Sequence, residues 1–345
     1  MSKSCSGNSW PIVVAGAGSI GCFVGAMLAA ADRRVSLLAR SRAIAEIADH
    51  GVRLTSFEGL DRHVAPPKFS LSGDPAILSE AAVVLVTVKS ADTAGIGDLL
   101  ARHAPPGVIV VSLQNGIGNA AVLRERLPGR RVLAAMVPFN VIAFGNGRFH
   151  RATSGDIAIE ADELGTAARL SVPGLVMRPT SKIDGVQWGK LLINLANALN
   201  ALSDLPLRKQ LARRPWRMLI ADQMVEALAV MSAEGIKPVS MTPVPSGLTP
   251  YLLRMPDWMF ELVLGRTMKI DREARSSMWE DLQRGRRTEI DYLQGVIVQL
   301  AERHELPAPL SRRVVALIKS AEAAGKCSPG LTPEQIREQA SSRPG

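Results

Sequence analysis

A glycine-rich turn near the start of the chain constrains the fold more strongly than any other feature of the sequence. It follows a short β-branched run, 12–15, and precedes an Ala/Leu-rich helical segment, 25–31, and a second strand, 35–38. This order predicts a βαβ unit, and the turn matches the GxGxxG pattern of dinucleotide-binding units. The residues expected to contact the dinucleotide are Gly16, Ala17, Gly18, Ser19, Ile20 and Gly21.

Each glycine of the turn has its own expected role. We expect Gly16 to allow the tight turn, Gly18 to let a pyrophosphate approach the backbone, and Gly21 to let the helix pack closely on the strand. The anion would lie at the helix amino terminus, where backbone N–H groups point. A chance glycine-rich loop is the alternative, and the strand and helix that flank the turn favour nucleotide binding.

The second strand indicates which dinucleotide is bound. Units that bind NAD carry an acidic residue about 20 residues after the glycines, whereas this strand ends in Ala-Arg-Ser-Arg, residues 39–42. The guanidinium of Arg40 suits a 2′-phosphate because it offers paired charge-assisted hydrogen bonds. We therefore expect NADP(H) as cofactor. The alternative is a solvated helix start, and we assign Arg42 to it.

Further apolar runs predict the rest of the fold. The runs 83–88, 108–113 and 132–137 are short enough to be buried parallel strands, and aromatic residues make up only 4% of the chain. From about Thr180 onward the pattern becomes helical. We expect an α/β fold in which a Rossmann-type doubly wound parallel sheet precedes a mostly α-helical domain. The expected parts are an amino-terminal tail (1–10), an NADP-binding domain (11–180), a substrate domain (181–326) and a carboxy-terminal tail (327–345).

Composition argues against several classes of protein. The formal net charge is +9, but Arg and Lys are scattered among 32 acidic residues, and the densest cluster, 284–287, lacks interleaved aromatics. Nucleic-acid binding is therefore not expected. The three cysteines lie far apart, without the spacing of a zinc site or a disulfide framework, so no metal is expected. With no apolar leader and no membrane-length apolar stretch, we expect a cytoplasmic protein.

A nearly apolar segment, 188–202, carries a lysine and three asparagines. On a helix, Lys190, Asn194 and Asn197 share one face at i, i+4 and i+7. A lysine on a helix is usually solvated, but the rest of this helix is too apolar to face solvent. The narrow polar stripe therefore predicts a wet cleft, in which a partly desolvated lysine has a lowered pKa and can donate a proton.

These residues belong to motifs that resemble the ketopantoate reductase (2-dehydropantoate 2-reductase) family, over most of the chain from Gly16 to about residue 325. The matching motifs, in order, are GAGSIG (16–21), VTVK (86–89), LQNG (113–116), WGKLLIN (188–194) and SSMWEDLQRGRRTEIDYLQG (276–295). The resemblance implies an amino-terminal Rossmann domain and a helical domain that bind NADPH. It also implies reduction of ketopantoate to pantoate in coenzyme A biosynthesis.

The resemblance assigns roles to individual positions. Lys190 matches the family's proton donor, and Asn194 matches a substrate-binding asparagine one turn away. Asn115 matches the asparagine that contacts both the nicotinamide side and the substrate, and Lys89 a lysine near the cofactor phosphate. For Asn115 the structural alternative is a simple turn before Gly116.

Two further roles come from the last motif. Ser277 resembles the serine that binds the substrate carboxylate, and Glu289 the glutamate near the catalytic lysine and the cofactor. Ser277 could instead cap the helix that follows, and Glu289 could favour a helix start electrostatically. We expect the functional role for both.

One position departs from the family pattern and leaves the substrate open. The family has a second substrate asparagine eight residues after the catalytic lysine, where this chain has Ala198; Asn197, on the Lys190 face, is the candidate substitute. A reductase of a different small 2-oxo acid is thus an alternative, and a redox-inactive NADPH sensor is an alternative from another class. The expected partner is a small 2-oxo acid, with a homodimer considered, and no nucleic acid or membrane.

Overall fold

The computed structural model describes residues 10–241, 244–265, 274–325 and 327–338. Contacts divide the chain into two compact units, residues 1–183 and 184–345. The expected boundary near residue 180 lies three residues earlier. Expectations for residues 1–9, 326 and 339–345 fall outside the described residues.

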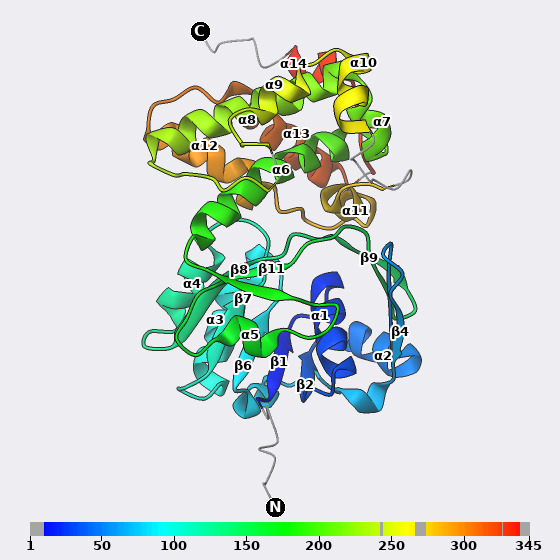
Figure 1. The fold of residues 1–345 in the computed structure, drawn as a ribbon, viewed down its shortest axis with the longest axis vertical. Coiled ribbons are helices and arrows are strands. Elements are labelled where there is room, and N and C mark those ends of the chain that lie inside the picture. The colour runs from blue at the N-terminus through cyan, green and yellow to red at the C-terminus, as the bar shows by residue number, and fades with distance from the viewer. Residues whose placement is uncertain (1–9, 242–243, 266–273, 326, 339–345) are drawn as a thin grey trace, which may run out of the picture. The chain divides into compact units, whose positions relative to one another are not determined.

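The first unit contains an eight-stranded sheet (Figure 1). Its strand order is β12-β11-β8-β7-β6-β1-β2-β5. The strands are β1 (Ile12–Ala15), β2 (Val35–Leu38), β5 (Ser70–Ser72), β6 (Val83–Val86), β7 (Ile109–Ser112), β8 (Arg131–Met136), β11 (Ile157–Glu160) and β12 (Met177–Thr180). From β5 to β8 all neighbours are parallel.

This order confirms the doubly wound fold and corrects one detail. The chain moves outward from β1 through β2 to β5, and then returns to the other side of β1 with β6, β7 and β8, so the switch point lies between β1 and β6. The sheet is not wholly parallel, however. β11 runs antiparallel to β8, where Ala158 and Ile159 pair with Met136 and Ala135.

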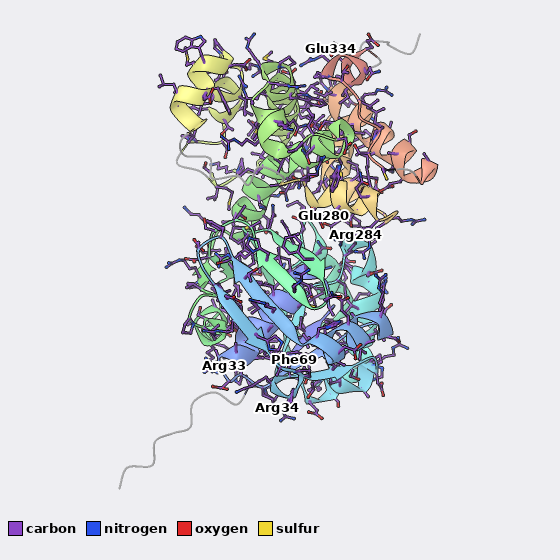
Figure 2. All side chains as sticks on the ribbon, turned by 90° about the vertical axis from the view of Figure 1, so that its right-hand side faces the viewer. Arg33, Arg34, Phe69, Glu280, Arg284 and Glu334 are labelled. Carbon is purple, nitrogen blue, oxygen red and sulfur yellow. The ribbon has the colours of Figure 1, made fainter. Side chains whose placement is uncertain are left out.

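Helices connect the parallel strands. They are α1 (Ser19–Ala30), α2 (Ser41–His50), α3 (Thr93–His103), α4 (Asn119–Arg126) and α5 (Thr166–Leu170), with 3-10 turns at Pro66–Lys68, Pro75–Glu80 and Ser90–Asp92. α1 begins at Ser19, within the glycine-rich motif 16–21 and earlier than the expected segment 25–31. Arg33 and Arg34 precede β2, at the amino ends of the strands and therefore opposite the glycine turn (Figure 2).

A second sheet of four strands was not predicted from the sequence. Its order is β4-β3-β10-β9, with β3 (Val52–Ser56), β4 (Asp61–Val64), β9 (Val141–Gly145) and β10 (Arg148–Arg151). These strands pack against α1, which also packs on β1 and β2 (Figure 1). Every residue of α1 from Gly21 to Ala29 is therefore buried, and the helix lacks the polar face of a surface helix.

All the regular secondary structure in the described residues of the second unit is helical. Its longest helices are α6 (Ile183–Ser203), α8 (Arg214–Ala233), α12 (Gln294–Arg303) and α13 (Pro309–Ala324). Shorter ones are α7 (Leu207–Leu211), α9 (Thr249–Leu253), α10 (Asp257–Phe260), a π-helical turn (Glu261–Gly265), α11 (Ser277–Gln283), a 3-10 turn (Ile290–Tyr292) and α14 (Pro333–Arg337).

The carboxy-terminal segment corrects another expectation. A surface tail was expected from residue 327, but residues 328–337 pack onto the helical unit. Ser328 Oγ donates to the Ala201 carbonyl at 2.5 Å, and Leu331 N donates to the Leu202 carbonyl at 2.8 Å. Thr332 caps α14 through a capping box, and Ile336 is fully buried. Apolar burial and capping thus order a segment whose Pro, Ser and Gly content suggested a tail.

Candidate active site

Four expected cofactor positions follow neighbouring strands of the first unit. Gly16 follows β1, Arg40 follows β2, Lys89 lies in the loop after β6 and Asn115 in the loop after β7. Because β7, β6, β1 and β2 are adjacent and parallel, these positions share the carboxyl edge of the sheet. Ligands of open α/β sheets bind at this edge, beside the switch point.

The geometry of the glycine turn fits the passage of a pyrophosphate. Gly16 has φ +116°, and a Cβ there would lie 2.9 Å from Val88 N, so a larger residue would be strained. A Cβ at Gly21 would lie 2.0 Å from the Gly16 carbonyl oxygen. At Gly18, in contrast, a Cβ would meet nothing within 4 Å, and the residue is exposed. The backbone is therefore accessible where the phosphates would lie.

Other residues of the turn support the same fit. Ala17, Ser19 and Ile20 are half-buried around it, and the first turn of α1 contains no acidic residue that would repel an anion. Thr87 Oγ1 donates to the Gly16 carbonyl at 2.6 Å and ties the turn to the loop after β6. Thr87 was not predicted as a site residue, although it belongs to the VTVK motif.

Arg40 lies at the carboxyl end of β2, one strand away from the glycine turn. It is the N-cap residue of α2, and its side chain is 90% exposed. Its guanidinium Nη2 lies 3.2 Å from Asp92 Oδ2. An exposed guanidinium at this edge can bind a phosphate, and Asp92 would compete with the phosphate for Arg40. Arg42, the second residue of α2, is also exposed.

A buried polar network holds the loop that carries Asn115. The Asn115 carbonyl accepts from Ser90 Oγ at 2.9 Å and from Asn119 Nδ2 at 2.8 Å. Asn119 Nδ2 also donates to Ser90 Oγ at 3.1 Å, and Thr93 Oγ1 donates to Asn119 Oδ1 at 2.8 Å. Gly116 has φ +85°, so Asn115 does precede a turn. The network fixes that turn, because buried polar groups need their partners.

The same network extends to the loop of Lys89. Gln114 Nε2 donates to the Val88 carbonyl at 3.1 Å and to Thr93 Oγ1 at 2.7 Å. Lys89 is half-buried and lies between Val88 and Ser90, both of which are hydrogen-bonded to the Asn115 loop. Ser90, Thr93, Gln114 and Asn119 were not predicted as functional, because a polar residue between apolar runs carries no signal of burial.

Helix α6 carries the lysine and asparagine stripe of the second unit. Lys190 is half-buried, and burial lowers its pKa from 10.5 to about 8. Asn194 is only 6% exposed, and Asn197 is half-buried. The expected desolvation of this lysine is therefore confirmed, and its protonated form can release a proton near neutral pH.

The backbone of residues 237–239 passes directly over α6 beside Lys190. Val239 N donates to the Gly185 carbonyl at 2.8 Å. A Cβ at Gly189 would lie 1.8 Å from the Val239 carbonyl oxygen, so only glycine permits this approach. The glycine of the WGKLLIN motif thus admits a chain segment next to the lysine.

Two other segments are tied to α6. Gln294 Nε2, at the start of α12, donates to the Leu195 carbonyl at 2.8 Å. Ser276 Oγ donates to the Asn197 carbonyl at 2.9 Å. The segments that carry Glu289 and Ser277 are therefore both anchored on the helix of Lys190.

Ser277 does not cap α11. Ser276 is the N-cap residue and accepts from Trp279 N at 3.2 Å, whereas Ser277 is the first helical residue and is exposed. The side chain that we expected to bind a carboxylate is thus not used as a helix cap. Glu280, one turn later on α11, has a pKa raised by burial, and Arg284 pairs with it at 3.6 Å (Figure 2).

Glu289 lies before the 3-10 turn Ile290–Tyr292 and is half-buried. Thr288 N donates to Glu322 Oε1 at 2.7 Å and anchors this loop to α13. Glu289 therefore lies at the start of a 3-10 helical turn, the kind of position that its alternative role at a helix start calls for. The hydrogen bond of Gln294 joins this segment to α6.

Ala198 and Asn200 explain how the asparagine pattern is used. Ala198 is fully buried, with 0% exposure. Asn200 is also fully buried, and its amide donates to the Leu205 carbonyl at 2.8 Å. Asn200 is thus engaged within the helical unit, and Asn197 remains the candidate for the missing substrate asparagine.

The described residues form no candidate metal site, and Cys22 of the Rossmann-like unit is buried. Within the described ranges, no group of three or more His, Cys, Asp or Glu side chains could hold a metal ion. Burial raises the pKa of the Cys22 thiol to about 12, so this cysteine is a poor nucleophile. No helix in the described part of the chain is long and apolar enough to cross a membrane.

Comparison with known proteins agrees with these features. Residues 12–163 match the family model described as "Ketopantoate reductase PanE/ApbA", and residues 182–322 match the model of its C-terminal domain. A 2-dehydropantoate 2-reductase of Halobacterium salinarum is 31% identical over 326 residues, which cover 91% of this chain and 99% of that protein.

Solved structures show the same architecture. A PanE/ApbA family ketopantoate reductase from Ralstonia eutropha has a TM-score of 0.78 at 31% identity, covering 91% of this chain and 99% of that one. A D-mandelate dehydrogenase in complex with NADH and anilino(oxo)acetate has a TM-score of 0.77 at 19% identity, with coverage of 91% and 99%. The latter likeness concerns the fold alone.

The Rossmann-like unit with its glycine turn and the helical unit with its desolvated lysine define a pyridine-nucleotide-dependent oxidoreductase. Within that class, the chain belongs to the ketopantoate reductase family, since the two family models together match most of its length. The resemblance inferred from the motifs is confirmed.

Proposed function

We propose that this protein reduces ketopantoate to pantoate with NADPH, and that Lys190 is the proton donor. The observation that carries the proposal is the half-buried Lys190 of α6, whose pKa is lowered to about 8, in a chain of the ketopantoate reductase family. The product would enter pantothenate and coenzyme A biosynthesis.

The chemistry requires one hydride and one proton. When bound, the nicotinamide supplies the hydride, which adds to the carbonyl carbon of the 2-oxo acid. The ammonium of Lys190 donates its proton to the carbonyl oxygen as negative charge develops there, and the resulting hydroxyl belongs to pantoate. The neutral amine then regains a proton from water. Its lowered pKa supports this role, because the group is protonated below pH 8 and yet a stronger acid than a solvated lysine.

The remaining polar residues of the helical unit would bind and orient the substrate. Asn194 and Asn197 lie on the Lys190 face of α6, and their side-chain amides would bind the carbonyl and hydroxyl groups of the substrate. The exposed hydroxyl of Ser277 would donate to the substrate carboxylate. Glu289 would hold the ammonium of Lys190 and a cofactor hydroxyl.

In the Rossmann-like unit, the turn 16–21 would hold the pyrophosphate, with Lys89 near a phosphate and Asn115 beside the nicotinamide. Arg40 would bind the 2′-phosphate and thereby favour NADPH over NADH. The exposure of Arg40 at the carboxyl end of β2 supports this assignment. The open backbone at Gly18 supports the pyrophosphate position.

Ala198 favours a second candidate substrate class. The buried methyl group at this position cannot donate the hydrogen bond that an asparagine would. A 2-oxo acid without the hydroxyl of ketopantoate would need no such donor, so reduction of another small 2-oxo acid is the alternative function.

The test is NADPH oxidation followed at 340 nm with purified protein. Ketopantoate is compared with 2-oxoisovalerate, which lacks the hydroxymethyl group and is otherwise similar. A kcat/KM at least tenfold higher for ketopantoate supports the proposal, and the opposite preference supports the alternative. NADPH binding without oxidation by either acid would contradict the enzymatic role and favour a sensor.

A further inference from the structure

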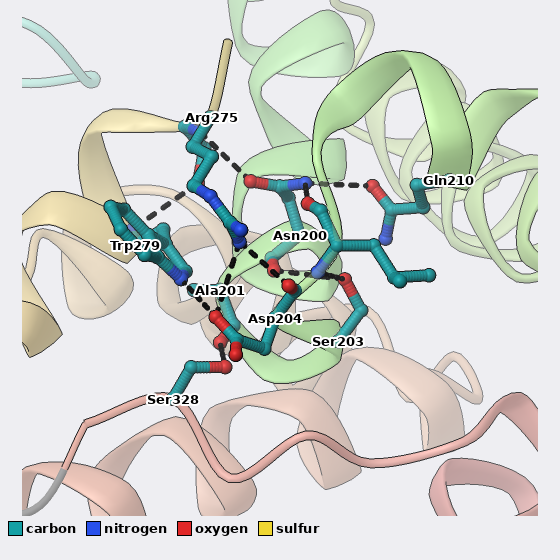
Figure 3. Close-up of polar contacts among 10 residues, drawn as sticks. Asn200, Ala201, Ser203, Asp204, Gln210, Arg275, Trp279 and Ser328 are labelled. Atoms are coloured by element: carbon teal, nitrogen blue, oxygen red, sulfur yellow. Dashed lines mark hydrogen bonds and ion pairs between the residues drawn. The ribbon is translucent and has the colours of Figure 1, made fainter. Parts of the chain in front are cut away.

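Polar contacts hold the residues on both sides of Ser277, the residue that we expect to bind the substrate carboxylate. Asp204 Oδ1 accepts from Trp279 Nε1 at 2.7 Å and from Arg275 Nη1 at 3.1 Å (Figure 3). The Arg275 guanidinium lies 4.3 Å from the centroid of the Trp279 ring. We call these three residues the α11 clamp. It joins the end of α6 to the start of α11.

Asn200 adds a second link, inside the helical unit. Its Oδ1 accepts from Ser276 N at 2.8 Å, and its Nδ2 donates to the Leu205 carbonyl and, at 3.2 Å, to Gln210 Oε1 (Figure 3). Ser276 Oγ in turn donates to the Asn197 carbonyl. A fully buried amide with partners on both atoms specifies one arrangement, because any other leaves it unsatisfied.

These links fall on both sides of Ser277. The Ala274 carbonyl accepts from Leu207 N at 2.9 Å, Arg275 and Ser276 are bound as described, and Met278 is buried. Trp279 is held by Asp204. Ser277 lies in the middle of this anchored run with its side chain exposed. The anchoring therefore fixes the backbone position of Ser277 and the direction of its Cα–Cβ bond.

The partners of these links lie on α6, in the turn that follows it, and on α7. Asn197 and Asn200 lie seven and ten residues after Lys190, which is roughly 10 and 15 Å along one helix. Asp204 adopts φ +54°, in the left-handed region, directly after α6 ends at Ser203. Helix α6 thus carries the lysine and two of the attachment points of α11, Asn197 and Asn200.

We propose that Asn200 and the α11 clamp are positioning residues that set Ser277 relative to Lys190, and thereby determine the affinity for the substrate carboxylate. The inference rests on the proposed function, since it assumes that Ser277 binds a 2-oxo acid. Asn200 would then act through the backbone of Ser276, without contact to the substrate. The asparagine two residues after Ala198 is in this way explained as part of the support for the site.

The test uses Asp204→Gly in the full-length protein. Glycine tolerates φ +54°, so the variant removes the carboxylate without backbone strain. At saturating NADPH, we expect KM for ketopantoate to rise at least fivefold while kcat changes less than twofold. KM for NADPH should stay within twofold. Asp204→Asn retains an acceptor for Trp279 and tolerates the same φ, so it should restore KM to near that of the parent.

A double-mutant cycle separates positioning from general support. If Asp204 acts through Ser277, the combination Asp204→Gly/Ser277→Ala should raise KM no more than Ser277→Ala alone. Asp222→Ala is the matched control, because it removes ion pairs to Arg254 and Arg337 in the same unit. It should lower Tm and leave KM unchanged. Trp279→Phe, which removes the N–H donor and leaves a smaller aromatic ring, should reproduce the direction of the Asp204→Gly effect.

The KM values of these variants distinguish failure of the α11 clamp from failure of the proposed function. A raised KM for Ser277→Ala with an unchanged KM for Asp204→Gly and Trp279→Phe would overturn the clamp and leave the proposed function standing. Multiplicative KM effects in the double variant would also overturn it. An unchanged KM for Ser277→Ala would contradict the carboxylate role in the proposed function, and the clamp with it.

Discussion

The carbonyl oxygen of Val239 lies so close to α6 that a Cβ at Gly189 would be only 1.8 Å from it. The residue after Gly189 is Lys190, the proposed proton donor. The backbone of residues 237–239 thus packs on α6 next to the position of Lys190 in the chain. The absence of a side chain at Gly189 permits this contact. Burial lowers the pKa of Lys190, and we expect the 237–239 segment to contribute to that burial.

We predict that Gly189→Ala destabilises the protein by about 2 kcal/mol, because the added methyl group must displace backbone atoms. It should also lower kcat and move the pKa of Lys190 back towards 10.5. The matched control is Gly95→Ala in α3, where a Cβ meets nothing within 4 Å. Here alanine should stabilise the helix by up to about 1 kcal/mol. Thermal unfolding measures the stability of both variants. Equal changes in Tm for Gly189→Ala and Gly95→Ala would contradict the importance of the close contact between Val239 and Gly189.

The pH dependence of reduction should report the pKa of Lys190. The reaction needs the protonated amine, so kcat/KM should be constant below about pH 7 and fall tenfold per unit above the pKa of about 8. A solvated lysine would keep the rate constant to about pH 10. The reverse oxidation needs the neutral amine and should therefore rise over the same range. A reduction profile that stays flat to about pH 10 would contradict the assignment.

Lys190→Ala should remove the proton donor and little else. We expect turnover to fall on the order of a hundredfold or more, with cofactor affinity nearly unchanged. The measurement is steady-state kinetics, with NADPH binding followed separately by fluorescence. Turnover close to that of the parent protein would require a different acid.

Arg40 and Asp92 make a prediction about cofactor choice. Arg40→Asp should lower kcat/KM for NADPH by about tenfold or more, since it removes charge-assisted hydrogen bonds to the 2′-phosphate. Asp92→Asn should act in the opposite direction, because Arg40 no longer shares its charge with a carboxylate. Neither should change Tm noticeably, as an exposed ion pair contributes little to stability. If the ratio of kcat/KM for NADPH to kcat/KM for NADH is unchanged in Arg40→Asp, the 2′-phosphate must bind at another site.

The sequence was most informative where local spacing determines structure. The run 12–15, the glycine turn and the strand 35–38 were each found at the predicted places, because a βαβ unit combines a period-2 strand, a tight turn and a buried helix within about 30 residues. The i, i+4, i+7 spacing of polar residues in the nearly apolar segment 188–202 of α6 likewise predicted the desolvation of Lys190, because that spacing depends on the helix alone.

Several of the missed features depend on contacts between distant residues. The strands β3 and β10 pair although they are about 95 residues apart in the chain, so this pairing has no local signal. The hairpins β3–β4 and β9–β10 are local, and the sequence analysis did not identify them. The Ser90–Asn119 bond and the Asn200–Ser276 bond likewise join residues 29 and 76 positions apart. Asn200 looked like a neighbour of the substrate stripe, and only its hydrogen bonds show that it supports α11.

The network behind Asn115 makes the last prediction. Asn119→Ala leaves the Asn115 carbonyl with one donor fewer and Thr93 Oγ1 with one acceptor fewer, so the free energy of unfolding should fall by about 1–3 kcal/mol. The looser Asn115 loop should also lower kcat/KM by about tenfold. Asn119→Asp should not restore activity, because a carboxylate cannot donate to the Asn115 carbonyl. Thr332→Ala, which removes the cap of α14, is the control: it should cost similar stability without changing kcat/KM. If both variants lower Tm and neither changes kcat/KM, the network supports the fold alone, and Asn115 does not depend on it.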